Sequence, residues 1–514
     1  MDAATENLSL LRMYIGPRNR FPLKLSTWLQ QQSSALRIER ATSIPKAWEE
    51  PAVLARKQGQ LCMNLFYPAL LLQLHHHVQG KEVTAPVSLH EQHAQSLRAA
   101  GANLAKAMLG VGLLALPKVT SLLGIGTTLI FLAFIAFLTY LSLHYCTVAS
   151  SRTGIVHYSD VVRDQTGLFG QTLLDLSLII NGAGVLIIAL IVIGDILVGS
   201  DGQGLLSPAC GDRSTVLAVV TVVLIAPLVS VTRLQTLAGA SVLGVAAIVG
   251  WSLLTLLLFI IAGTNDQLHH MAWWPSRKSK FVGHGFESAV QVIATLPVIL
   301  VAFICQMSLQ GVLRDLQYVR DRQVDKISST ALMITVISYA AIGIFSYGVF
   351  GKNVSPDVLQ SFTVDALEPL LSQKLAQAAF VAVRLGFLIS LLGTFPLQMT
   401  PLRDALWKLL FRQELRGPGL WLVTYLLLAG VLMAAAWIES IWEPLVLIGS
   451  TAGVLIALIF PGLLAIQTPE LLTEPLGAHR WRQVGGVVLV FVGLVIGVFG
   501  LIRVFAFRDP FGEG

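Results

Sequence analysis

A lysine, two glycines and a proline lie within about three helical turns of one another, near the start of the first long apolar stretch. The stretch reads NLAKAMLGVGLLALPK and holds Lys106, Gly110, Gly112 and Pro117. Glycine tolerates non-helical dihedrals and lets other groups approach the backbone, and proline removes a backbone donor. A helix broken at membrane depth must line a cavity or contact protein, and its freed amides can bind a carboxylate. The pattern therefore predicts a substrate site at which Gly110, Val111 and Gly112 offer backbone amides.

Lys106 precedes Gly110 by four residues, and its charge has two interpretations. An ionisable residue inside a membrane span is costly, so it indicates a functional site, here one for an ion or a proton. Alternatively, the long apolar stem lets the amine reach the inner headgroups. The two glycines also have a second explanation, because small residues let membrane helices pack closely.

Other ionisable residues also fall inside the predicted apolar spans. They are Asp175, Asp195, Glu287 and Arg384. The acidic residues lie near span ends, where an interfacial charge or a helix cap explains them as well as a function does. For Arg384, a structural ion pair is the alternative to a function.

Two later spans combine prolines with polar residues and are further candidates for a break. The first, ATLPVILVAFICQMSLQG, contains Pro297, Gln306 and Ser308. The second, LLGTFPLQMTPLRD, contains Gly393, Thr394, Pro396, Thr400 and Pro401. The first and sixth spans would be corresponding helices of a bundle built from two five-helix repeats, and inverted-repeat transporters break corresponding helices.

The composition is that of a protein embedded in lipid. Of its 514 residues 54% are hydrophobic and 12% charged, with a mean hydropathy of +0.72, whereas about a quarter of the residues in a soluble domain are charged. Windows of about 20 apolar residues recur and predict an all-α polytopic membrane protein with about eleven transmembrane helices. The predicted spans are 100–121, 124–149, 171–199, 214–231, 237–262, 286–309, 328–350, 375–400, 419–437, 442–466 and 484–506.

Charge and hydropathy together predict three parts and an orientation. Residues 1–95 are predicted to be a cytosolic, partly disordered leader. Residues 96–508 form the transmembrane domain, and 509–514 a short non-cytosolic tail. Loops rich in Lys and Arg favour the cytosolic side, so we interpret the net charge of +6 as a topology signal and not as nucleic-acid binding. In this orientation Asn353 begins an exposed glycosylation sequon, Asn353-Val354-Ser355.

Several stretches, in their order and spacing, resemble the amino acid/auxin permease family, which includes the sodium-coupled neutral and the proton-coupled amino acid transporters. They are NLAKAMLGVGLLALP, IVIGDIL, PLVSVTRLQTLAGASVLG, AFICQMSLQGVLRDL, GTFPLQMTPLRDAL and LVLIGSTAGVLIALIFPGLLAI. The resemblance runs from about residue 100 to 506. It implies a leucine-transporter-like bundle of eleven helices, with a 5+5 inverted-repeat core and the substrate between the first and sixth helices. It also implies L-amino acids as the substrate class.

The resemblance also bears on the coupling ion. Sodium-coupled members hold Na⁺ with an Asn of the first helix and a Thr of the eighth. Thr394 matches that Thr, but the Asn position falls on Lys106, which instead matches a lysine that proton-coupled members carry four residues before the G-x-G. The usual histidine of the sixth helix is Gln306 here. These departures favour sodium-independent transport, with proton coupling ahead of pure facilitation.

Further site residues follow from the same resemblance. Phe303 and Gln306 are expected near the amino group of the substrate, and Phe395 is expected to act as a gate or to pack. Family members often join the loops after the third and fifth helices by a disulfide. Here Cys210 lies in the first loop, but residues 263–285 contain no cysteine, so no internal disulfide is predicted.

The resulting prediction is a transporter of neutral L-amino acids that works by alternating access in the lipid bilayer. Its membrane is the plasma membrane or that of a lysosome or vacuole. One alternative is a transceptor that signals through the leader, and another is a carrier of a polyamine or an auxin-like compound. The spans show no nucleophile–base pair and no metal-ligand spacing, so we expect neither an enzyme nor a metal or cofactor site. No oligomeric state is predicted.

Overall fold

The computed structural model describes residues 101–199, 204–206, 212–230, 238–275, 292–315, 321–411, 419–438, 440–468 and 477–506. The chain divides into two units, residues 1–86 and 87–514, and everything described below belongs to the second. The predicted leader and tail lie outside the described residues, as do Cys62, Cys210 and Glu287.

Within the described ranges, all regular structure is helical. The first half of the first span is Gly101–Met108. The other elements, in chain order, are η1 (Val111–Ala115), α5 (Leu116–Leu123), α6 (Ile125–Thr153), α7 (Tyr158–Leu197), α8 (Arg213–Val220), η3 (Thr221–Ile225), α9 (Ala226–Val229), α10 (Ala238–Thr264), α12 (Leu296–Ala302), α13 (Gln306–Asp315), α14 (Asp321–Phe350), η5 (Gly351–Asn353), α15 (Val358–Ser361), α16 (Val364–Leu367), α17 (Gln373–Phe411), α18 (Gly419–Trp437), α19 (Trp442–Ile448), η6 (Gly449–Gly453), η7 (Leu455–Ile459), α20 (Phe460–Gln467) and α21 (Ala478–Ala506).

These helices follow the predicted spans in order. In the described part of the chain, eight helices are long and apolar enough to cross a membrane, and one bent pair forms a ninth span. Two shorter apolar helices, Arg213–Val229 and Leu296–Leu309, correspond to the predicted fourth and sixth spans. The prediction of an all-α polytopic membrane protein is therefore confirmed. The third span begins earlier than predicted, since α7 includes a first segment that ends at Gly167, where φ is +76°.

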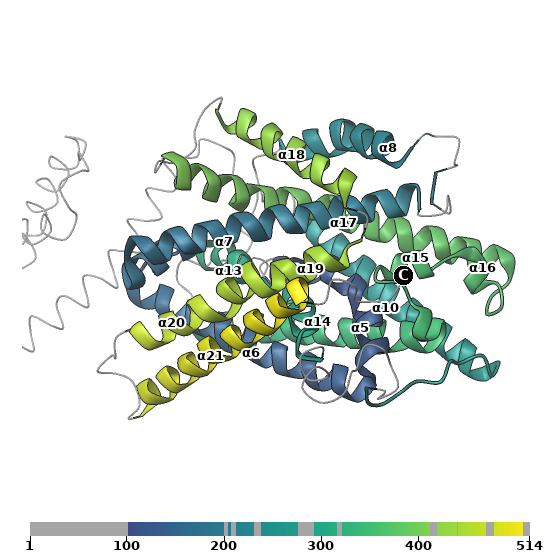
Figure 1. Ribbon diagram of the computed structural model, residues 1–514, viewed down its shortest axis with the longest axis horizontal. Coiled ribbons are helices and arrows are strands. Elements are labelled where there is room, and N and C mark those ends of the chain that lie inside the picture. Colours follow the sequence, from purple (N-terminus) through teal and green to yellow (C-terminus); the bar gives the residue numbers. More distant parts are fainter. Residues whose placement is uncertain are drawn as a thin grey trace, which may run out of the picture. The chain divides into compact units, whose positions relative to one another are not determined.

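Two long helices form the centre of the bundle. α7 and α17 lie against each other, and α18 packs on α7 together with α8 (Figure 1). α14 contacts α5, α6 and α10, and α21 packs against α20. The most hydrophobic part of α7 is largely buried in the protein, whereas only 22% of that of α18 is buried. Lipid can therefore cover α18, while α7 forms part of the core.

Two spans are broken, the first at its glycines and the sixth at residues 303–305, and neither break lies at a proline. Gly101–Met108 and Val111–Leu123 meet at an angle of 44°. In the sixth span, α12 ends at Ala302 and α13 begins at Gln306. Pro117 and Pro297 each lie in the first turn of a helix, where the missing amide would have no helical partner.

The third predicted break, in the eighth span, is wrong. α17 continues from Gln373 to Phe411 with Pro396 and Pro401 inside it. Beside the prolines, Thr394 donates to the Ser390 carbonyl at 3.1 Å and Thr400 donates to the Pro396 carbonyl at 3.0 Å. Membrane helices tolerate proline where hydroxyl side chains and neighbouring helices compensate for the lost backbone bonds.

Candidate functional site

The first break places the three predicted amide donors at the start of a half-helix. The Leu109 amide still donates to the Ala105 carbonyl at 2.8 Å, but the Gly110 amide donates to the Met108 carbonyl at 2.7 Å. The helix then restarts as η1 with Val111 and Gly112. The first amides of a helix have no partner inside it and carry partial positive charge. This end can therefore receive a carboxylate.

Gly112 lies where the two broken spans approach each other most closely. A Cβ added to Gly112 would lie 2.6 Å from the Cβ and 2.7 Å from the Cα of Ala302, in α12. A Cβ on Gly110 would meet nothing closer than the Met108 carbonyl, at 3.9 Å. The space beside Gly112 thus belongs to α12, and Gly110 is the glycine with room beside it.

The sixth-span break presents one aromatic and one amide side chain. Phe303 is fully buried and meets Tyr339 edge to face, with ring centroids 5.3 Å apart. The side-chain oxygen of Gln306 accepts a hydrogen bond from the backbone amide of Cys305 at 3.0 Å. Its side-chain nitrogen donates to the Ser142 hydroxyl at 3.1 Å. The Gln306 side chain therefore holds the residue before α13 and ties α13 to α6.

Tyr339 of α14 connects the two breaks, and it was missed from the sequence. Its hydroxyl contacts the Met108 carbonyl, at the end of the first half-helix, and the Ala302 carbonyl, at the end of α12, at 2.7 Å. A phenol has one proton, so it donates to one of these carbonyls at a time. A tyrosine in the middle of an apolar span was the available signal, because a buried hydroxyl needs a partner.

We expect Tyr339→Phe to reduce transport about tenfold. The Met108 carbonyl keeps the Gly110 amide as a donor, but the Ala302 carbonyl loses the Tyr339 hydroxyl. Removal of a donor from a buried polar group costs about 1–3 kcal/mol, which corresponds to about tenfold in an equilibrium constant. Tyr347→Phe on the same helix is the matched control, because the Tyr347 hydroxyl accepts the Ala272 amide, away from both breaks. Initial uptake rates in proteoliposomes measure both variants, and equal rates would contradict the assigned role of Tyr339.

Lys106 is buried, with 2% of its surface exposed, and its amine is bound inside the protein. The ammonium donates to the Ser390 hydroxyl at 2.7 Å, to the Thr394 hydroxyl at 3.1 Å and to the Leu109 carbonyl at 3.4 Å. On the α10 side, a Cβ on Gly244 would lie 2.8 Å from the Lys106 Cε. The side chain therefore fills a site between the first half-helix, α10 and α17. It does not reach toward headgroups as the alternative interpretation required.

The ligands of this ammonium are neutral oxygens. Two are hydroxyls of α17 and one is a carbonyl at the end of a half-helix, where the dipole favours a cation. Hydroxyl and carbonyl oxygens are also oxygens that can bind small metal cations. Ser390 was not identified from the sequence, although it lies one helical turn before Thr394 and so shares its face.

The remaining candidate residues have structural contacts. Phe395 is fully buried in α17 and packs in the core. Asn353 is exposed at the end of η5. Asp175 accepts from the Ser159 hydroxyl at 2.6 Å. Cys146 and Cys305 are free, and because Cys62 and Cys210 lie outside the described residues, the absence of a disulfide stays a prediction.

Comparison with known proteins gives consistent matches. The family model described as "Transmembrane amino acid transporter protein" matches residues 93–506. Amino acid transporter AVT6A of Arabidopsis thaliana is 27% identical, over 81% of this chain and 89% of its own. Amino acid transporter AVT6E of the same plant is 26% identical, over 71% and 74%. Vacuolar amino acid transporter 5 of Schizosaccharomyces pombe is 23% identical, over 70% and 81%.

A solved structure shares the fold. The manganese transporter of Eremococcus coleocola, in complex with an aromatic bis-isothiourea compound, aligns with a TM-score of 0.55 at 12% identity. The alignment covers 84% of this chain and 91% of the other. The likeness shows the fold alone, which is the leucine-transporter-like bundle expected from the sequence.

Proposed function

The chain belongs to the transmembrane amino acid transporter family, and we propose that it carries neutral L-amino acids across the membrane by alternating access. The observation that carries this proposal is the pair of breaks. In the first span the amides of Val111 and Gly112 begin a half-helix, next to α12 and the Phe303 turn. The half-helix end suits the substrate carboxylate, and freed carbonyls suit the substrate ammonium.

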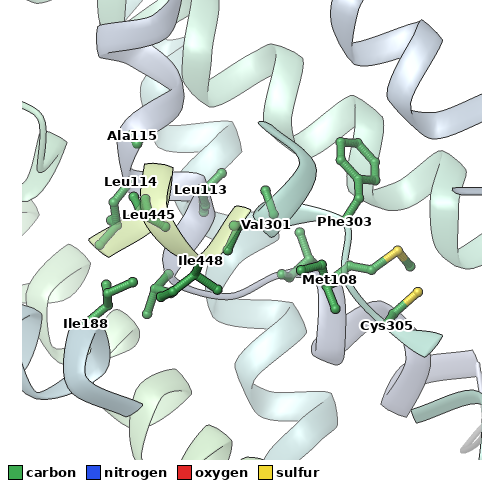
Figure 2. Close-up of a cluster of buried hydrophobic side chains, with 14 of the residues drawn as sticks. Met108, Leu113, Leu114, Ala115, Ile188, Val301, Phe303, Cys305, Leu445 and Ile448 are labelled. Atoms are coloured by element: carbon green, nitrogen blue, oxygen red, sulfur yellow. The ribbon is translucent and has the colours of Figure 1, made fainter. Parts of the chain in front are cut away.

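A neutral substrate is favoured by the apolar surroundings of the breaks. Met108, Leu113, Val301 and Phe303 belong to one buried hydrophobic cluster around the two breaks (Figure 2). A charged substrate side chain would lose hydration among these residues without gaining a partner. An aliphatic or aromatic side chain would bury apolar surface there.

We further propose that transport does not depend on sodium. The Lys106 side chain places a positive charge between α10 and α17, and its ammonium donates hydrogen bonds to Ser390 and Thr394. Like charges repel strongly in a medium of low dielectric, so this ammonium would exclude Na⁺. A buried amine can also release and rebind a proton, because burial disfavours its charged form. Proton coupling is therefore proposed ahead of facilitation.

For location, we propose the membrane of an acidic compartment, with the plasma membrane as the alternative. The support is the relative named a vacuolar amino acid transporter. We also propose that the leader, residues 1–95, is cytosolic, as the basic loops predicted. The turn after α14 would then face the lumen or the exterior.

The test of the proposed function is uptake of a panel of labelled amino acids by purified full-length protein in proteoliposomes. We expect neutral L-amino acids to accumulate or exchange, and charged ones to compete poorly. Uptake of a polyamine or an auxin-like compound with no amino-acid uptake would refute the proposal. Deletion of the leader in the same assay addresses signalling, because transport that survives unchanged argues against an obligatory sensor.

The orientation is tested at Asn353. This residue is exposed after α14, so expression in a glycosylating host should add a glycan if the turn is non-cytosolic. Endoglycosidase should then increase gel mobility, and Asn353→Gln should remove that shift. Cleavage of an epitope at this turn by a protease confined to the cytosol would show that the orientation is reversed.

A further inference from the structure

A short cap between α14 and α17 reaches the substrate site. It consists of residues 354–372 with the helices α15 and α16, and α15 contacts both η1 and α7. Val358, Leu359 and Phe362 of the cap are buried. Phe362 meets the Trp251 ring of α10 edge to face, with centroids 5.8 Å apart, and the Phe350 ring at 4.9 Å. The cap is thus inserted between helices on the side where α7 ends.

Arg384 of α17 joins this cap to the end of α7. Its guanidinium is buried and donates to the carbonyls of Asp195 at 2.9 Å and Ile196 at 3.2 Å. It also donates to the Leu359 carbonyl of the cap at 3.2 Å. The last carbonyls of a helix have no partner inside it and favour a cation. This differs from the ion pair considered as an alternative for Arg384, because its hydrogen bonds go to main-chain oxygens.

The carboxylate of Asp195 is bound by other groups. Arg213 of α8 donates to it at 3.2 Å, and Gln360 of the cap donates at 3.0 Å. Arg213 therefore compensates the charge of Asp195, and the hydrogen bond from Gln360 helps to hold the cap against α7. The negative charge of Asp195 also acts on the second acidic residue of this region, Asp357.

Asp357 lies immediately before α15, and its carboxylate has fewer hydrogen-bond donors than that of Asp195. It is 2% exposed, and one carboxyl oxygen accepts the Leu359 amide at 2.8 Å. The other oxygen is buried without a hydrogen-bond partner. The charged groups that act on it are Asp195 from α7 and Arg384 from α17, and Arg213 reaches the cluster only through Asp195. A buried carboxylate in this position lacks the donors that a charge requires.

We propose that Asp357 is a proton-binding site of the cap, so that the cap closes over the substrate path with Asp357 protonated and opens when the proton leaves. The protonated carboxyl carries no charge, which removes both the cost of burial and the repulsion from Asp195. The inference rests on the proposed orientation, in which the cap faces the lumen or the exterior. An acidic lumen would then favour closure from its own side.

The pH dependence follows from linkage. Burial, followed by the charge of Asp195, raises the pKa of Asp357 to about 8, against the opposing effects of the Leu359 amide and Arg384. In an open cap an exposed aspartate has its ordinary pKa of about 4. Because the pKa of Asp357 is higher in the closed state, protonation of Asp357 stabilises the closed cap. This stabilisation is complete below about pH 4 and is lost as the pH rises through about 8. Closing the cap therefore takes up a proton.

The test is hydrogen exchange of the cap amides, residues 355–368, in full-length protein in lipid nanodiscs between pH 6 and pH 9. Protection is corrected for the intrinsic effect of pH on exchange. In wild-type protein we expect protection to fall about tenfold per pH unit from pH 6 to about 8 and to level off above it. Asp357→Asn keeps an oxygen for the Leu359 amide but cannot ionise, so its protection should stay at the pH 6 level up to pH 9. Asp365→Asn is the matched control, an exposed cap aspartate that should behave like wild type.

The outcomes separate this inference from the proposed function. Constant protection in wild type would overturn the proton site, as would a loss of protection in Asp357→Asn that matches wild type. If Asp357→Asn does not fold, the wild-type titration alone decides. The exchange measurement needs neither substrate nor ions, so amino-acid uptake without a cap transition refutes only the cap. A cap transition without uptake refutes only the proposed function.

Discussion

Lys106→Met is expected to lower amino-acid transport by at least about tenfold. The ammonium holds the first half-helix to α17 through Ser390 and Thr394, and hydrogen bonds to a charged group contribute about 1.5–3 kcal/mol each. Methionine fills a similar volume but donates no hydrogen bond, so the two helices lose their polar connection. Loss of even one such bond in a transport intermediate would lower the population of that intermediate by about tenfold or more.

The matched control for this variant is Lys352→Met. Lys352 is an exposed lysine of η5, so its removal changes the net charge equally but leaves the site intact. Initial uptake rates at equal protein density in proteoliposomes measure both. If Lys106 carries the coupled proton, the variant should also lose the response to a pH gradient. Wild-type uptake by a well-folded Lys106→Met protein would show that the amine has no part in transport.

Gly112→Val is expected to abolish transport. The first added carbon would already lie 2.6 Å from the Ala302 Cβ and 3.0 Å from its backbone nitrogen, and backbone cannot rotate away as a flexible side chain can. η1 and α12 would have to separate, and overpacking of this kind costs about 1–3 kcal/mol. We therefore expect a lower melting temperature as well as the loss of transport.

The control is Gly110→Ala, two residues earlier. Its added carbon meets only the Met108 carbonyl at 3.9 Å, and the Gly110 φ of −123° suits any residue. The variant should therefore fold with a wild-type melting temperature. Thermal unfolding of both purified variants, followed by uptake, separates packing from substrate contact. A normal melting temperature for Gly112→Val would contradict the close approach to Ala302.

The spans and the first break could be predicted because their signals are local. About 20 apolar residues in a row indicate a membrane helix without knowledge of its neighbours, and Gly110 and Gly112 lie at the observed break. The third break was wrong for a local reason as well. Pro396 suggests interruption, but α17 continues through it, and membrane helices tolerate proline where surrounding groups satisfy the freed backbone.

The partners at the site could not be predicted because they are distant in sequence. Lys106 and Ser390 are separated by 284 positions, and Tyr339 meets two carbonyls that become available only when both spans break. The ion-site role expected for Thr394 came from the family resemblance and not from its own span. The contact between Gly112 and Ala302 likewise depends on packing, which no single stretch of sequence encodes.

The most direct test of the account is the sodium dependence of uptake by wild-type protein. Proteoliposomes that contain the purified chain take up a transported neutral amino acid at fixed pH, first in Na⁺ and then with all Na⁺ replaced by choline. Because we propose that the Lys106 ammonium replaces a coupling cation, we predict equal uptake rates in the two media. Uptake that requires Na⁺ would contradict the account, since a sodium ion and the ammonium cannot share the Ser390 and Thr394 hydroxyls.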